Sequence, residues 1–131
     1  MCVNRGLTGP VPDGASLIKI NRHNRSDFEK RMQDENFDAA IDMCCYSRDD
    51  ALSSVRAFRG VDHFVNCSSV ATFGRQFDWL PTTEDHPLRP WTDSEYGVKK
   101  AEADDIFLEA YRKEGFPVTL LKPSTIIPQF T

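Results

Sequence analysis

A tyrosine and a lysine stand four residues apart in the stretch "DSEYGVKKAEAD" (93–104), as Tyr96 and Lys100. In a helix this spacing puts both side chains on one face, one turn apart. A free phenol titrates at about 10, and a nearby ammonium lowers that pKa because it favours the phenolate. The pair could therefore serve as a general acid/base. The spacing is common in helices, however, and by itself it favours an exposed aromatic beside a solvated lysine.

A serine in the preceding apolar run changes this balance. The stretch "HFVNCSSVATFG" (63–74) has the pattern of a strand that ends in small hydroxyl residues and then a glycine. Because α/β proteins bind ligands at the carboxyl ends of parallel strands, we expect a serine of this run, Ser68 or Ser69, to face a ligand there. A serine can hydrogen-bond a substrate oxygen while a tyrosine transfers the proton.

The elements that position these residues follow from the hydrophobic pattern. Short apolar runs alternate with longer helical patterns, which is typical of an α/β fold in which helices cover a parallel sheet. Ser26 with Glu29 forms a predicted capping box, and Gly115 a predicted C-terminal cap. We therefore predict a Rossmann-like parallel sheet. Its predicted strands are 1–3, 16–20, 37–46, 61–69 and 116–124, its predicted helices are 26–37, 47–58 and 94–115, and 74–90 is a predicted loop.

Composition narrows the function classes. The 131 residues suit one domain, and 16 Lys and Arg against 20 Asp and Glu give a net charge of −4 without a basic run. Nucleic acid is therefore not expected as the main partner. No apolar run approaches the roughly 20 residues that cross a bilayer, so we expect a cytoplasmic protein without membrane contact.

The cysteines and histidines do not suggest a metal site. None of the cysteines has C-x-x-C spacing, which favours buried free thiols over disulfides or zinc. The histidines are scattered without ligand spacing, so no metal is predicted. The residues concerned are Cys2, Cys44, Cys45, Cys67, His23, His63 and His86.

A glycine-rich phosphate loop is not found. Gly6, Gly9 and Gly14 are interrupted by Pro10 and Pro12, and a strand follows them where a phosphate cradle needs a helix. If the first apolar run is the second strand in the usual order 3-2-1-4-5-6, the middle strand is missing. Two inner strand edges would then be unpaired. Either they close on each other or the chain is a fragment, and we favour the fragment.

Three stretches together resemble a known family. "FVNCSSVATFG" (64–74), "SEYGVKKAEAD" (94–104) and "FPVTLLKPS" (116–124) are similar to the extended short-chain dehydrogenase/reductase family, whose NAD-dependent epimerase/dehydratase group acts largely on nucleotide sugars. The resemblance implies that residues 1–131 form a partial NAD(P)-binding Rossmann-like domain. It also implies that the family's first strand with its glycine-rich turn and its C-terminal substrate-binding part are absent.

The resemblance assigns catalytic roles. The family's catalytic Ser/Thr matches Ser69, its catalytic tyrosine matches Tyr96, and Lys100 matches the lysine that holds the nicotinamide ribose and lowers the tyrosine pKa. These residues would carry out NAD(P)-dependent oxidation, reduction or epimerisation of a small molecule, either a nucleotide sugar or another carbonyl or carbinol compound. The family's dehydratases place Asp and Glu after the Ser/Thr, where Val70 and Ala71 stand here. That argues against dehydration.

The resemblance also assigns cofactor contacts. Asn4 and Arg5 follow the first apolar run, which matches the family's second strand, and neither side chain has a carboxylate. The Arg5 guanidinium suits a 2′-phosphate, which favours NADP over NAD. Asn21, followed by Arg22, stands where the family binds adenine. Met43, Cys44 and Cys45 match residues that pass beneath the cofactor, and core packing is an equal alternative for the two cysteines. Pro123 and Ser124 match the loop beside the nicotinamide. Lys122, which precedes them, stands where the family usually has an arginine.

Other readings stay open. The chain could be a non-catalytic binding or regulatory module of the same fold, or an inactive truncated fragment. The complete Ser69, Tyr96 and Lys100 set favours an enzyme, while the missing phosphate loop favours the alternatives. Family members commonly dimerise through their two long helices, so the resemblance leaves a homodimer open. Ile106, Phe107 and Leu108 suit such an interface and a core equally well.

Overall fold

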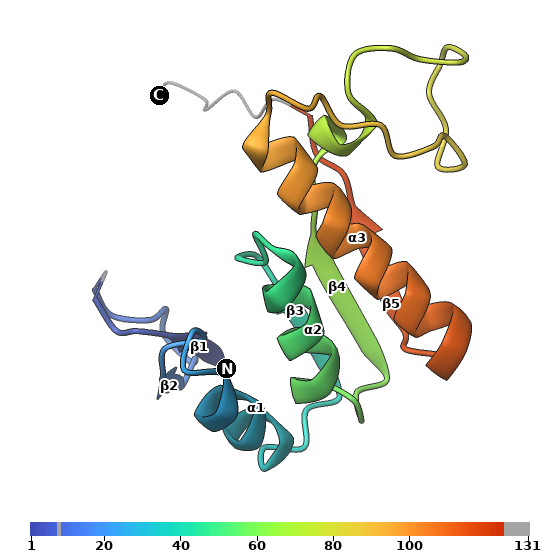
Figure 1. Cartoon of the computed structure of the whole chain (residues 1–131). Helices are drawn as coiled ribbons and strands as arrows, with labels where there is room; N and C mark the ends of the chain where they lie inside the picture. Colours follow the sequence, from blue (N-terminus) through green and yellow to red (C-terminus); the bar gives the residue numbers. More distant parts are fainter. Residues whose placement is uncertain (8, 125–131) are drawn as a thin grey trace.

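The computed structural model describes residues 1–7 and 9–124. After two successive strands, helices and strands alternate along the chain, as the hydrophobic pattern predicts (Figure 1). The elements in order are β1 (Cys2–Asn4), β2 (Leu17–Lys19), α1 (Arg25–Gln33), β3 (Ala39–Asp42), α2 (Arg48–Ala57), β4 (His63–Cys67), the 3-10 helix η1 (Val70–Phe73), α3 (Glu95–Glu114) and β5 (Val118–Leu121). None of these helices is long and apolar enough to cross a membrane.

The strands form two parallel sheets. β1 pairs with β2, and β4 lies between β3 and β5, with Phe64 opposite both Ala40 and Val118. The predicted α/β class with a Rossmann-like parallel sheet is confirmed. Among the described residues no strand pairs β1 with β3, and Figure 1 shows β1 and β2 set apart from the other three strands. The two inner edges therefore do not close on each other.

Aromatic side chains hold α2 and α3 against one face of the larger sheet. Phe64 of β4 has no exposed surface and lies 5.2–5.4 Å, between ring centroids, from Phe58, Phe107 and Phe116. Tilted rings at these distances add to the hydrophobic gain of burial. Phe107, like Ile106, belongs to this core and not to an exposed face. The opposite sheet face is open, and Ile41 of β3 is 68% exposed there.

The predicted helix ends are right for α3 and wrong for α1. Ser94 caps α3 by accepting a hydrogen bond from the Gly97 N–H at 3.2 Å, and Gly115 ends the helix in the left-handed conformation. In α1, however, Ser26 lies inside the helix and Asn24 precedes it. Glu29 does not complete a capping box, because its carboxylate pairs with Arg56 of α2 at 2.7 Å.

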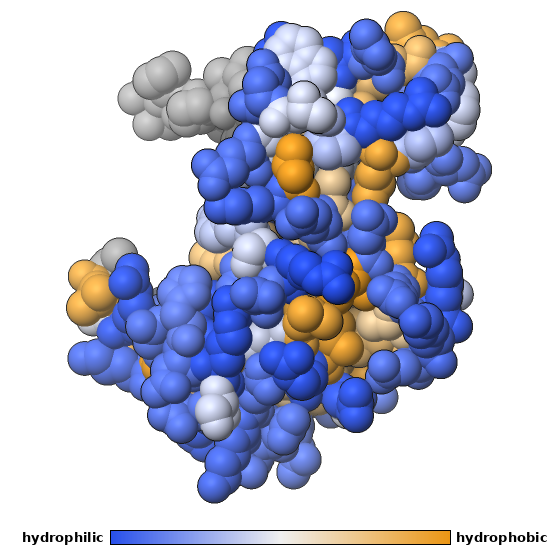
Figure 2. Space-filling model, in the orientation of Figure 1, coloured by the Kyte–Doolittle hydropathy of each residue, from blue (hydrophilic) through white to orange (hydrophobic). Residues whose placement is uncertain are grey.

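The segment after β4 folds back onto the domain. Its 3-10 helix was not predicted, whereas the loop after Gly74 was. His86 is 3% exposed and packs against Phe73 and Trp79. The Asp78 N–H donates to its Nε2 at 3.0 Å, so Nδ1 carries the proton that is donated to the Pro87 carbonyl. Figure 2 shows hydrophobic side chains at this loop, where Leu80 is 77% exposed.

Candidate active site

Ser69 lies directly after β4, where the sequence predicts it. It has extended backbone angles and caps the 3-10 helix, since its Oγ accepts a hydrogen bond from the Ala71 N–H at 3.1 Å. The Thr72 hydroxyl donates to the Ser69 carbonyl at 2.9 Å. These bonds fix the backbone at the carboxyl end of the strand, and the Ser69 side chain is half-buried there.

Tyr96 and Lys100 occupy the first turns of α3 and differ sharply in burial. Tyr96 is 49% exposed, whereas Lys100 is 2% exposed. The Lys100 ammonium donates to the Cys67 carbonyl at 2.7 Å and lies 5.9 Å from the centre of the Tyr96 ring. The helix therefore brings the two residues together on one face. The spacing alone favoured an exposed tyrosine beside a solvated lysine. Tyr96 is indeed half-exposed, but Lys100 is not solvated.

A glycine lets α3 approach the serine. A Cβ on Gly97 would come within 3.0 Å of the Ala71 carbonyl and 3.2 Å of Ser94 Oγ. Any larger residue would push the helix away from the 3-10 turn. Gly97 therefore permits the close packing that places Tyr96 beside the strand end that carries Ser69.

A buried charge cluster lies behind these three residues. Asp104, one turn beyond Lys100 on α3, has no exposed surface and accepts a hydrogen bond from the Ser68 hydroxyl at 2.7 Å. Lys122, after β5, donates to Asp104 and, at 2.7 Å, to Thr72 Oγ1. The cluster joins the ends of β4 and β5 to α3 and to the 3-10 helix. It therefore fixes the elements that carry the candidate catalytic residues.

A cavity of about 870 Å³ lies between the two sheets. The carboxyl ends of β1, β2 and β3 line it together with apolar side chains such as Phe37 and Ile41. Its volume is in the range of small-molecule sites. Six of the predicted cofactor contacts lie on its wall: Asn4, Arg5, Asn21, Arg22, Met43 and Cys44.

The other predicted cofactor contacts lie elsewhere. Cys45 has no exposed surface and belongs to the hydrophobic core, so the two neighbouring cysteines separate into one core residue and one cavity residue. Pro123 is half-buried, and its carbonyl accepts a hydrogen bond from the Val70 N–H at 3.2 Å, while Ser124 is exposed. These two residues follow Lys122 at the end of β5, near the 3-10 helix.

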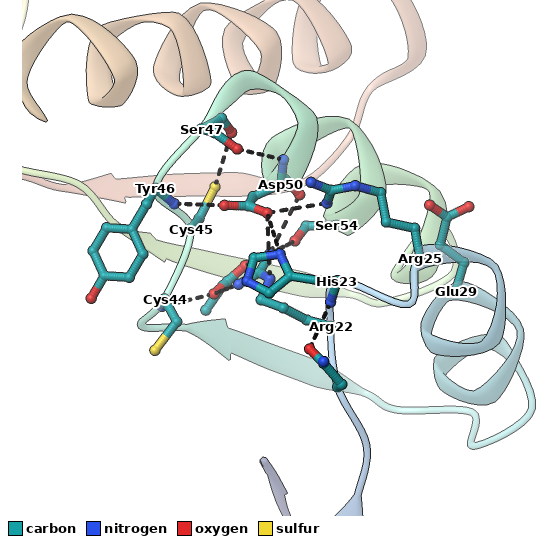
Figure 3. Close-up of polar contacts among 12 residues, drawn as sticks. Arg22, His23, Arg25, Glu29, Cys44, Cys45, Tyr46, Ser47, Asp50 and Ser54 are labelled. Atoms are coloured by element: carbon teal, nitrogen blue, oxygen red, sulfur yellow. Dashed lines mark hydrogen bonds and ion pairs between the residues drawn. The ribbon is translucent and has the colours of Figure 1, made fainter. Parts of the chain in front are cut away.

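Arg22 is held inside a polar network that Figure 3 shows around Asp50. Its guanidinium donates to Asp42 at 2.8 and 3.0 Å and to Ser54 Oγ at 3.1 Å. Burial by itself would lower the pKa of Arg22, but Asp42 and Asp50 outweigh it and raise that pKa. Arg22 thus ties the end of β2 to β3 and α2, and the guanidinium is already engaged before any ligand binds.

Asp50 is the centre of that network. Its carboxylate, 3% exposed, accepts a hydrogen bond from the Tyr46 N–H at 3.1 Å and pairs with Arg25 of α1 at 3.1 Å. Burial opposes ionisation, but the Tyr46 N–H, Arg22 and Arg25 outweigh it and hold the pKa of Asp50 below its ordinary value. The network fixes the turn between β3 and α2.

Replacing Asp50 with asparagine is expected to lower the free energy of unfolding by about 1.5–3 kcal/mol near neutral pH. The amide keeps an acceptor for the Tyr46 N–H but loses the charge opposite Arg22 and Arg25. Because folding lowers the pKa of Asp50, its contribution is complete above the unfolded-state value of about 3.9 and is lost as the pH falls through the folded-state value. Urea unfolding of both proteins across this range should show their stabilities converge at acid pH. A constant difference would contradict this account.

The two adjacent cysteines should differ in reactivity. Burial raises the pKa of the Cys45 thiol to about 12, whereas Cys44 is exposed on the cavity wall. Iodoacetamide at a mildly alkaline pH is expected to modify Cys44 and to leave Cys45 unmodified in the folded chain, since the thiolate is the reactive form. Fragment mass spectra of the modified peptide would separate the two sites. Urea-unfolded chain, in which both should react, is the control.

Sequence reasoning missed two residues of the site. Tyr46 ends the predicted 37–46 strand, and an aromatic residue at the carboxyl end of a parallel strand was a signal that could have identified it. Asp104 stands four residues after Lys100, so the spacing rule that joined Tyr96 to Lys100 also points to it.

The free thiols were predicted, but of the four only Cys45 is buried.

Comparison with known proteins agrees with this architecture. A curated relative, 2'-dehydrokanamycin reductase from Streptomyces kanamyceticus, is 31% identical over 101 residues, which are 77% of this chain and 28% of the relative. Two solved structures share the fold. UDP-glucose 4-epimerase from Thermotoga maritima with UDP-glucose has a TM-score of 0.71 at 18% identity, over 92% of this chain and 45% of that one. RMD from Pseudomonas aeruginosa complexed with NADPH has a TM-score of 0.63 at 19% identity, over 93% and 52%.

The chain thus spans about a quarter to a half of the length of these proteins. At these identities the two structures establish the fold alone. The family model for the NAD dependent epimerase/dehydratase family matches residues 23–130, which include the strand end with Ser69 and the helix with Tyr96 and Lys100. The chain therefore belongs to the NAD dependent epimerase/dehydratase family.

Proposed function

We propose that the chain is part of an NAD(P)-binding domain of an oxidoreductase or epimerase that acts on a sugar-like carbonyl or carbinol, with Ser69, Tyr96 and Lys100 as its catalytic residues. One observation carries the proposal: a nearly fully buried ammonium lies beside a half-exposed phenol at the carboxyl end of a parallel strand. In the described part of the chain this ammonium has no carboxylate partner, only the Cys67 carbonyl. It is therefore available to act on the phenol and on a ligand.

Each residue has a separate task in this proposal. The Ser69 hydroxyl donates a hydrogen bond to the substrate oxygen and orients it toward the phenol. Tyr96 gives a proton to that oxygen in reduction and takes one from it in oxidation. The Lys100 ammonium, 5.9 Å from the centre of the Tyr96 ring, stabilises the negative charge that forms on the phenol oxygen when Tyr96 gives up its proton.

The described residues suit a nicotinamide dinucleotide in part. When bound, such a cofactor accepts or supplies hydride. Asn4, Arg5 and Asn21 on the cavity wall would bind its adenosine side, and Lys100 has two N–H groups left for ribose hydroxyls. Among the described residues Arg22 is already paired, whereas Arg5 is exposed and forms no ion pair. The preference for NADP therefore rests on Arg5, which could pair with a 2′-phosphate.

Two substrate classes follow from the relatives. The structural neighbour that was solved with UDP-glucose favours a nucleotide sugar. The curated relative is by name a 2'-dehydrokanamycin reductase, which favours reduction of a carbonyl group. Val70 and Ala71 after the serine supply no acid or base, so both proposed reactions use the tyrosine as their proton carrier. A soluble cytoplasmic enzyme, monomeric or homodimeric, suits either substrate.

Titration of the purified chain with NADPH and with NADH, followed by nicotinamide fluorescence, tests the proposal. We expect saturable binding with preference for NADPH, and we expect Arg5→Gln to reduce that preference because it removes the charge opposite the 2′-phosphate. Arg59→Gln, at an exposed arginine just after the end of α2, is the matched control. Circular dichroism reports folding. A folded chain that binds neither nucleotide would support a non-catalytic module instead.

A further inference from the structure

Lys100 contacts a second tyrosine that the proposed reaction does not use. The Lys100 ammonium lies 4.8 Å from the centre of the Tyr46 ring, closer than its 5.9 Å from the centre of the Tyr96 ring. Both distances are within the range of cation–π attraction, which grows when the cation is withdrawn from water. Lys100 is 2% exposed. The ammonium is therefore held by one carbonyl and faces two aromatic rings.

The backbone of Tyr46 is fixed independently of its ring. Its N–H donates to the buried Asp50 carboxylate at 3.1 Å, and the next residue, Ser47, caps α2. Asp50 is in turn paired with Arg25 of α1. Figure 3 shows the Tyr46 ring pointing away from this network. The turn after β3 thus presents the ring from a rigid base, toward Lys100 of α3.

Tyr46 also belongs to the cavity between the two sheets. It lies on the cavity wall with Cys44 and Met43, and it is 51% exposed. Ser69, Tyr96 and Lys100 are not on that wall. Tyr46 is therefore the described residue that touches both the cavity, which holds the predicted adenosine contacts, and the catalytic lysine.

We propose that Tyr46 is a cofactor-positioning residue: its ring holds the Lys100 ammonium in place and forms the wall along which a nicotinamide nucleotide passes from the cavity to the catalytic residues. This inference rests on the proposed function for the identity of the ligand. The contact with Lys100 is a property of the chain itself.

Tyr46 does not compete with Tyr96 as the proton carrier. The neighbouring Cys44, then burial, then the nearby Tyr96 raise the pKa of Tyr46. Its phenol accordingly stays neutral at physiological pH. What it offers Lys100 and a ligand is the ring and not an exchangeable proton, so a phenylalanine should replace it and an aliphatic residue should not.

The contact is tested first without any ligand. Lysine-selective ¹³C labelling gives six side chains, of which Lys100 is assigned by Lys100→Arg. Tyr46→Leu is expected to remove the part of the ring-current shift of the Lys100 methylene protons that the Tyr46 ring causes, while the part caused by the Tyr96 ring remains. Tyr46→Phe is expected to retain both parts. Tyr46→Met is a second non-aromatic variant should the leucine variant be poorly folded. Unchanged Lys100 signals in the folded aliphatic variants would overturn the proposal.

Nucleotide binding supplies the second measurement. The aliphatic variants are expected to raise the Kd for NADPH about 2- to 30-fold, which is the range of a cation–π contact. Tyr46→Phe is expected to keep most of the wild-type affinity. Tyr111→Leu, at an exposed tyrosine near the end of α3, is the matched control. Weakened binding in the Tyr111 variant, or unchanged binding in the aliphatic variants, would overturn the positioning role. If the wild-type chain binds no nicotinamide nucleotide, the proposed function and the nucleotide-positioning role of Tyr46 both fail, and the lysine spectra still decide the Tyr46–Lys100 contact.

Discussion

Replacing Tyr96 with phenylalanine is expected, in the oxidoreductase or epimerase proposed above, to lower turnover about 10²- to 10⁴-fold, the usual contribution of a positioned general acid/base. The substitution removes one hydroxyl and keeps the ring, so the contact between the ring and the Lys100 ammonium remains. Tyr96 is also 49% exposed and does not belong to the hydrophobic core, so the substitution should not affect the fold. The loss should therefore fall on kcat, with little change in nicotinamide binding.

The measurement is oxidation of NADPH or NADH with sugar ketones, among them 2'-dehydrokanamycin and UDP-linked ketosugars. Tyr111→Phe makes the same chemical change on the same helix, at a tyrosine that is 59% exposed and distant from the strand ends, and it should leave turnover unchanged. Binding of NADPH to the Tyr96 variant separates a chemical loss from a binding loss. Full turnover by Tyr96→Phe would show that another group carries the proton.

The sequence was sufficient for the helix that bears Tyr96. Its helical pattern and Gly115 at its end are local signals, and Gly115 ends α3 in the left-handed conformation. The same kind of signal failed in α1, because Glu29 has a stronger partner in Arg56, which lies far away in sequence. A local rule cannot weigh a tertiary partner that it does not contain.

In the candidate site, too, local features were predicted and tertiary contacts were not. The spacing of Tyr96 and Lys100 is local and was predicted, as was the strand end that bears Ser69. The Tyr46 ring reaches Lys100 only because β3 and α3 are brought together by the sheet and by helix packing. Likewise, Arg22 was predicted as a cofactor contact from its place after β2, and nothing in its neighbourhood in the sequence reveals that Asp42 and Asp50 engage it.

Replacing Lys122 with methionine is expected to lower the free energy of unfolding by about 3–5 kcal/mol, because it leaves the Asp104 carboxylate as an unpaired charge in the core. Asp104 has no exposed surface, and its Oδ1 already has no hydrogen-bond partner among the described residues. Methionine retains most of the length and apolar surface of lysine, so the loss reports the charge and not a cavity. Typical domains are stable by about 5–15 kcal/mol, so this one change could consume much of the total.

A double variant distinguishes the buried pair from the lysine alone. Asp104→Asn keeps an acceptor for the Ser68 hydroxyl and removes the charge, so Lys122→Met combined with Asp104→Asn should be more stable than Lys122→Met by itself. Lys113→Met breaks an exposed ion pair with Glu109 on α3, the helix that carries Asp104, and should have little effect on the free energy of unfolding. Urea unfolding monitored by circular dichroism gives the free energies. Equal losses for Lys113 and Lys122 would contradict a buried pair.

The buried pair also makes a prediction about the site, because its hydrogen bonds reach Ser69. Lys122 donates to Thr72 Oγ1, and the Thr72 hydroxyl donates to the Ser69 carbonyl. Loss of the ammonium frees Thr72 and with it the strand end that bears Ser69, the residue proposed to bind the substrate oxygen. If the double variant restores stability without restoring kcat, Lys122 positions Ser69 through Thr72. If both recover together, the pair acts on the site through the stability of the fold alone.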